Sequence, residues 1–118
     1  MIDLAKRAVA CKGWRWMPGM LARCGGRKMR SKRSGRSPYR GALPDLADPA
    51  TLGCLLALVR EAWGDKGIHT ECTLEEDGQG GWVRDWVIIS SFPLLWTINE
   101  PPYDTEAAAF VAALEAAP

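Results

Sequence analysis

The residues best suited to chemistry in this 118-residue chain are positively charged side chains gathered in one segment. Between Arg23 and Arg40 the sequence holds eight lysines and arginines and no acidic residue. Clustered cations release condensed counterions from phosphates, which is the main source of affinity for nucleic acids. The candidate binding residues are these cations and the aromatic and cationic residues near them: Trp14, Arg15, Trp16, Arg23, Arg27, Lys28, Arg30, Lys32, Arg33, Arg36, Tyr39 and Arg40.

Two tryptophans precede the basic segment, and their spacing suggests a second part of such a site. Trp14 and Trp16 alternate around Arg15 with the period of a β-strand, which would point both indoles to the same side. A rigid indole pair beside positive charge could stack on a nucleic-acid base or on a partner's side chain. Alternatively, the pair closes one end of the hydrophobic core. The Pro18-Gly19 pair that follows predicts a type II turn, with a positive φ at Gly19.

The net charge of +1 conceals an uneven distribution along the chain. Residues 1–43 carry twelve basic side chains and one acidic, whereas 45–118 carry three basic and thirteen acidic, giving formal charges of +11 and −10. One interpretation is a basic loop lying against an acidic sheet face of the same molecule. A second interpretation is that the basic segment is simply a solvated loop. Two further interpretations involve a partner: the basic segment docks on an acidic surface of another protein, or the basic half of one copy meets the acidic half of a neighbouring copy in a homo-oligomer.

Residue types that carry enzyme chemistry form no recognisable constellation. His69 is the only histidine, and Cys72, three residues later in an expected strand, would point to the opposite face. The sequence has no nucleotide-binding fingerprint, nucleophile elbow or zinc-protease motif. Cys11, Cys24 and Cys54 are too far apart, from one another and from Cys72, for a structural zinc site. We therefore expect no enzyme, no metal and no cofactor, with the thiols reduced.

The central helix is the clearest element that the sequence predicts. It covers Pro49–Trp63, with Asp48 as its N-cap and Gly64 as its end. Leu56 and Val59 are expected to be almost fully buried. They belong to an apolar stripe of residues three and four apart, formed by Leu52, Leu55, Leu56, Val59, Ala62 and Trp63.

Two shorter helices are predicted near the ends of the chain. The first covers 4–12, with Asp3 as its N-cap. The second covers Glu106–Ala116, and either Asp104 or Thr105 caps it. An apolar stripe on each predicts one face turned toward the core.

Strands complete an α+β fold. Alternating patterns predict strands beginning near 20–22 and over 68–74, Trp82–Ser90 and 94–98, followed by a Pro-rich turn at 99–103. We expect one small domain over 1–118, with the central and C-terminal helices packed on one face of an antiparallel sheet of three or more strands. The basic loop at 23–41 is expected to be mobile, or to be a hairpin that a partner orders.

Composition narrows the class of protein. Hydrophobic residues make up 47% of the chain and charged residues 25%, which is ordinary for a globular domain with a core. No apolar stretch approaches the roughly 18 residues of a membrane span, and the first residues lack a signal-peptide core. The expected protein is therefore soluble and intracellular, with no membrane partner.

Three blocks of the sequence resemble a group of small proteins encoded by tailed bacteriophages and prophages. The blocks are LAKRAVACKGWRWMPGMLA, LPDLADPATLGCLLALVREAWGD and TEAAAFVAALEAAP, and they cover 56 of the 118 residues. The group carries no activity to transfer, so the resemblance assigns no role to any residue. It implies a viral origin and a small accessory role.

Two functional hypotheses follow. The first is a non-enzymatic phage accessory protein of the host cytoplasm that acts by binding, above all as an inhibitor of a host anti-phage defence system through a defence protein or its nucleotide signal. This step is an analogy with other small phage proteins. The alternative is a nucleic-acid-binding module that uses the basic segment at 23–40.

Overall fold

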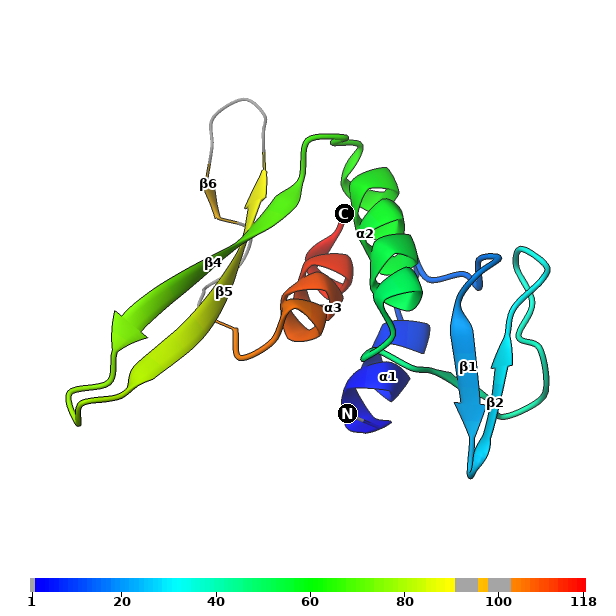
Figure 1. The fold of residues 1–118 in the computed structure, drawn as a ribbon. Helices are drawn as coiled ribbons and strands as arrows, with labels where there is room; N and C mark the ends of the chain where they lie inside the picture. Colours follow the sequence, from blue (N-terminus) through cyan, green and yellow to red (C-terminus); the bar gives the residue numbers. More distant parts are fainter. Residues whose placement is uncertain (1, 91–95, 98–102) are drawn as a thin grey trace.

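A computed structural model describes residues 2–90, 96–97 and 103–118 (Figure 1). Its elements follow in chain order: α1 (Ile2–Val9), β1 (Leu21–Cys24), β2 (Arg27–Arg30), β3 (Leu43–Pro44), α2 (Pro49–Trp63), β4 (His69–Glu76), β5 (Trp82–Ser90), β6 (Trp96–Thr97) and α3 (Glu106–Ala116).

The strands form two antiparallel sheets, with strand orders β2-β1-β3 and β4-β5-β6. The three helices lie between them, so that one hairpin projects on each side of the helical layer (Figure 1). This arrangement confirms the α+β class with antiparallel sheets. The strands are divided between two sheets instead of sharing one, because β1, β2 and β3 pair locally before α2 begins.

Helix α2 has the bounds and both ends that the sequence predicts. The side chain of Asp48 accepts a hydrogen bond from the backbone N–H of Thr51, and Pro49 stands in the first turn, where its missing N–H has no consequence. Gly64 ends the helix in the left-handed conformation, with φ 63°, which glycine adopts without steric cost.

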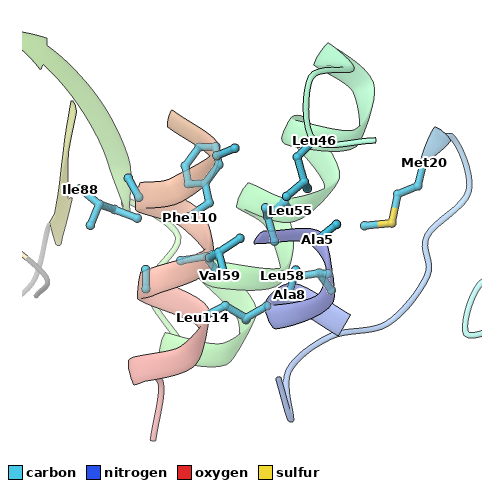
Figure 2. Packing of buried hydrophobic residues seen from close by; sticks show 14 of the residues in the cluster. Ala5, Ala8, Met20, Leu46, Leu55, Leu58, Val59, Ile88, Phe110 and Leu114 are labelled. Carbon is cyan, nitrogen blue, oxygen red and sulfur yellow. The ribbon is translucent and has the colours of Figure 1, made fainter. Parts of the chain in front are cut away.

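The hydrophobic core lies where the three helices meet (Figure 2). From α2 it takes Leu55, Leu58 and Val59, all at most 1% exposed, and the buried hydroxyl-bearing residue Thr51. Val59 is buried as expected, but the expectation for Leu56 is wrong, because this side chain is only half-buried. Successive residues are rotated by about 100° around a helix axis, and the buried arc is centred on Leu55 and Leu58.

The short helices agree with the sequence to different degrees. Helix α3 has its predicted bounds and Thr105 as N-cap, whose hydroxyl accepts a hydrogen bond from Ala108 N at 3.1 Å. Helix α1 covers Ile2–Val9 and not 4–12, so Asp3 lies inside its first turn and is not the N-cap. In that position the Asp3 carboxylate still interacts favourably with the partial positive charge of the helix N-terminus.

The C-terminal sheet is built on the β4–β5 hairpin, whose register runs from His69 opposite Ile89 to Glu76 opposite Trp82. Strand β5 has its predicted bounds, and β4 extends two residues beyond the predicted end at 74. Of the strand and turn predicted at 94–98 and 99–103, only 96–97 and 103 are described.

Within the described residues, no helix has the length and apolar character needed to cross a membrane.

Candidate nucleic-acid interface

The basic segment folds into a hairpin and a loop, residues 21–41, which we call the basic arm. Strands β1 and β2 pair from Leu21 opposite Arg30 to Cys24 opposite Arg27, joined by the two glycines between them. Strand β1 also pairs with β3. The segment therefore contains a hairpin, one of the two expected forms, and pairing within the chain contributes to holding it in place.

The N-terminus of α2 fixes this hairpin to the helical layer. Thr51 Oγ1 accepts a hydrogen bond from Leu21 N at 2.9 Å and donates one to Asp48 Oδ2 at 2.9 Å. Asp48 in turn accepts two hydrogen bonds from the Arg30 guanidinium, at 2.8 and 2.9 Å. Both strands of the hairpin are thus tied to one carboxylate–hydroxyl pair, and Thr51 itself is completely buried.

The Asp48 carboxylate is stabilised in its charged form. The Arg30 guanidinium lowers the pKa of Asp48 well below its usual range, and the hydrogen bonds from Thr51 add to the effect. Because the pKa is lower in the folded than in the unfolded state, this stabilisation is complete at neutral pH. It is lost only as the pH falls below the unfolded-state value toward the folded-state one.

Replacing Asp48 with alanine is expected to lower the free energy of unfolding by about 1–2 kcal/mol, because the helix loses its N-cap and Arg30 loses its partner. Asp48→Asn is the control, since asparagine caps a helix as well as aspartate but carries no charge; its loss should be below about 1 kcal/mol. Urea denaturation measures both. Equal losses in the two variants would show that the ion pair, and not the cap, carries the contribution.

The loop of the basic arm is also fastened to the body of the protein. The backbone N–H of Gly35 donates to the carbonyl oxygen of Trp16 at 2.7 Å. The hydroxyl of Tyr39 lies 3.1 Å from the carbonyl oxygen of Arg27 and 3.3 Å from that of Ala22. Tyr39, a predicted binding residue, is half-buried and joins the loop to the hairpin. Its ring therefore has a structural role in this arrangement.

A hollow of about 310 Å³ opens between strand β2 and the loop. Three exposed cations from the predicted set, Lys32, Arg33 and Arg36, line it together with Arg30. Sequence reasoning missed the rest of the lining, because single residues of these types inside a basic run form no pattern: Met29, Ser31, Ser37 and Pro38.

Six of the eight cations in the basic arm make no ion pair within the described residues: Arg23, Arg27, Lys32, Arg33, Arg36 and Arg40. All six are exposed. The other two are engaged within the chain, since Arg30 binds Asp48 and the Lys28 ammonium lies 3.8 Å from the buried Asp45 carboxylate. The available positive charge is therefore concentrated at the hairpin end, the hollow and the loop.

The other candidate binding residues, Trp14, Arg15 and Trp16, make their contacts within the molecule. Residues 14–17 form no strand, and the two indoles contact each other edge to face, with centroids 5.6 Å apart. Trp16 is 7% exposed, so its ring has no free face for stacking. Trp14 is half-buried, and its buried indole N–H has no hydrogen-bond partner among the described residues. The Arg15 guanidinium binds Glu61 at 2.7 Å. Trp16 belongs to the core cluster and Trp14 packs against it, which favours the interpretation of the indoles as an end of the core.

The uneven charge along the chain is in part neutralised inside the molecule. Four ion pairs of the described residues join residues 1–43 to residues 45–118: Arg7–Glu115, Arg15–Glu61, Lys28–Asp45 and Arg30–Asp48.

The type II turn predicted at Pro18-Gly19 is confirmed, with Gly19 at φ 96° and a hydrogen bond from Met20 N to Met17 O.

The remaining chemically capable residues are dispersed. All four cysteines are free, and burial raises the pKa of the Cys11 and Cys54 thiols, which makes them poorer nucleophiles. The His69 ring nitrogens face the Gly67 carbonyl at 3.0 Å and the Glu71 carboxylate at 3.4 Å. Among the described residues, no group of three histidine, cysteine or acidic side chains is arranged to hold a metal ion.

No protein-family model, curated protein or solved structure matches this chain.

Proposed function

We propose that this protein acts by binding, and that the basic arm contacts the phosphates of a nucleic acid. One observation carries the proposal: six exposed cations without an ion pair among the described residues lie on the basic arm, a hairpin and loop that contacts within the chain hold in place. Lysine and arginine side chains on a preformed surface bind phosphates without first giving up an internal partner.

The shape of the surface favours a polymeric ligand over a single nucleotide. A pocket for a small ligand encloses most of it and places a few polar groups in the interior. Here Lys32, Arg33 and Arg36 are exposed around an open hollow, and further cations continue to Arg27 at the hairpin turn. Such a spread matches phosphates repeated along a strand.

The basic arm offers no available aromatic face, so it is poorly suited to stacking on bases and has its cations for contacts with phosphates. Tyr39 is held by its hydroxyl, and Trp14 and Trp16 pack on each other. Contacts with phosphates position a protein on a nucleic acid without reading its sequence. We therefore propose binding that is largely independent of base sequence.

The resemblance to phage and prophage proteins supports a wider proposal. In that setting the chain is an accessory protein of the host cytoplasm, and its phosphate-binding surface interferes with a nucleic acid or a nucleotide signal that a host defence system uses. Both targets carry phosphates, and the open shape of the surface makes the nucleic acid the favoured one of the two.

Fluorescence anisotropy with labelled single- and double-stranded oligonucleotides tests the proposal. If four or five cations contact phosphates, the logarithm of the association constant should fall against the logarithm of salt concentration with a slope of about −3 to −4. A labelled mononucleotide forms the second arm, and tighter binding to it than to the oligonucleotides would contradict the polymeric ligand. No binding of any of these at about 25 mM salt, where the electrostatic attraction is least screened, would refute the proposal.

A further inference from the structure

The β4–β5 hairpin forms a second arm on the opposite side of the helical layer from the basic arm (Figure 1). We call its outer part, residues 71–85, the acidic arm. The sequence there has five carboxylates and one guanidinium, a net charge of −4. The longest dimension of the molecule is 44 Å. The helices thus lie between the two arms and keep them apart (Figure 1).

The acidic arm exposes large apolar side chains, which globular proteins usually cover. Trp82 is 70% exposed, Leu74 is 61% exposed and Val83 is 42% exposed. Trp82 lies on the same side of the hairpin as Ile88, because residues at even spacing along a strand share a face. Ile88 is completely buried.

Helix α3 covers this face only at the inner end of the hairpin. Thr70, opposite Ile88 in the register, donates its hydroxyl to Glu106 of α3 at 3.0 Å. Leu74 and Trp82 stand further out on the same face, beyond the part that α3 covers. The core-facing side of the hairpin therefore continues into a surface that the described residues leave open.

The chain itself carries a surface that complements the acidic arm. The basic arm has six exposed cations without an ion pair among the described residues, and Met29, 52% exposed, at the edge of its hollow. Guanidinium and ammonium groups bind the face of an indole, and a methionine side chain adapts to an aromatic ring. Screening acts over about 8 Å at physiological ionic strength, so the two arms of one molecule cannot satisfy each other across the helical layer.

We infer that the acidic arm of one copy docks on the basic arm of a second copy, with Trp82 and Leu74 at the centre of the contact. Glu76 and Arg84 share their face of the hairpin, and the net negative charge of the arm as a whole attracts the cations of the second copy. The contact joins two different surfaces, so it is head-to-tail and can be repeated. This inference goes beyond the proposed function, since it concerns association of the protein with itself in the absence of nucleic acid.

Sedimentation velocity of the purified chain tests the inference. We expect the average mass to rise above the 12.9 kDa monomer as the protein concentration increases at about 50 mM salt, and to return toward it at about 500 mM salt. A monomer at every concentration at low salt would overturn the inference.

Two variants, each defective in one arm, test the head-to-tail geometry. The acidic-arm variant combines Glu76→Lys with Trp82→Ser, which are cross-strand neighbours at the outer end of the hairpin. The basic-arm variant combines Lys32→Glu, Arg33→Glu and Arg36→Glu. Each is expected to be monomeric alone, whereas their equimolar mixture should form dimers and nothing larger, because one intact acidic arm meets one intact basic arm.

The mixture distinguishes this contact from other forms of association. A mixture that stays monomeric, or a single-arm variant that still associates as the parent does, would overturn the inference. Circular dichroism confirms that each variant is folded before it is mixed. These outcomes do not depend on nucleic acid, so failure here would leave the proposed function untouched, and loss of oligonucleotide binding would leave this inference untouched.

Discussion

The Leu55→Ala variant is expected to unfold with a free energy about 2–5 kcal/mol below that of the parent. Leu55 has no exposed surface and lies in the cluster where α1, α2 and α3 meet (Figure 2). Truncation removes three carbons, and the surrounding helices can close only part of the cavity. Domains of this size have about 5–15 kcal/mol of stability in total, so thermal and urea denaturation should show the loss clearly.

Leu56→Ala is the matched control for this prediction. It makes the same chemical change at the next position of the same helix, but Leu56 is half-buried. Its side chain already contacts water, so less apolar surface is lost and no closed cavity forms. The expected loss is well below that of Leu55→Ala. A larger loss at Leu56 than at Leu55 would mean that α2 turns a different face toward the core.

Replacing Lys32, Arg33 and Arg36 together with serine should weaken oligonucleotide binding by about a hundredfold or more at 0.1 M salt. Each phosphate contact contributes about a factor of ten at that concentration, and the salt slope should become less negative by about 2–3. The three side chains are exposed and make no ion pair within the described residues, so stability should change by less than about 0.5 kcal/mol. Arg30 is left in place because it holds the hairpin to Asp48.

The control removes the same charge elsewhere. Lys6, Lys12 and Lys66 are exposed and likewise make no ion pair among the described residues, and their replacement with serine changes the net charge by the same three units. If the two triple variants lose affinity equally, the protein attracts nucleic acid through its overall charge, and the basic arm is not the site.

Helix α2 and strand β5 could be predicted from the sequence because their signals are local. Asp48, Pro49 and Gly64 mark the ends of the helix by their own backbone preferences. Alternation over Trp82–Ser90 likewise needs no knowledge of the rest of the chain. Which leucines of α2 are buried could not be predicted as easily. Leu56 and Leu58 both suit an amphipathic helix, and the packing of the other helices decides which of them is buried.

The position of the candidate site in the sequence could be predicted from composition, because the density of positive charge marks the basic segment. The contacts that hold the segment in place could not be predicted in this way. The ion pair of Arg30 with Asp48 could not be predicted, because the two residues are eighteen positions apart and Asp48 also suits the N-cap of α2. The hydroxyl group of Thr51, which connects the two, carries no recognisable pattern. The sequence left two roles open for Trp16, since an indole suits a core and a stacking surface equally well, and the structure buries it.

The separation of the two arms gives the molecule a large electric dipole moment along its length. Positive charge gathers at one end and negative charge at the other, across a molecule 44 Å long. In the field of a polyanion such a molecule experiences a torque before contact, which turns the basic arm forward and keeps the acidic arm away. Random orientation normally slows the docking of two specific surfaces, and this torque raises the fraction of encounters that arrive correctly oriented.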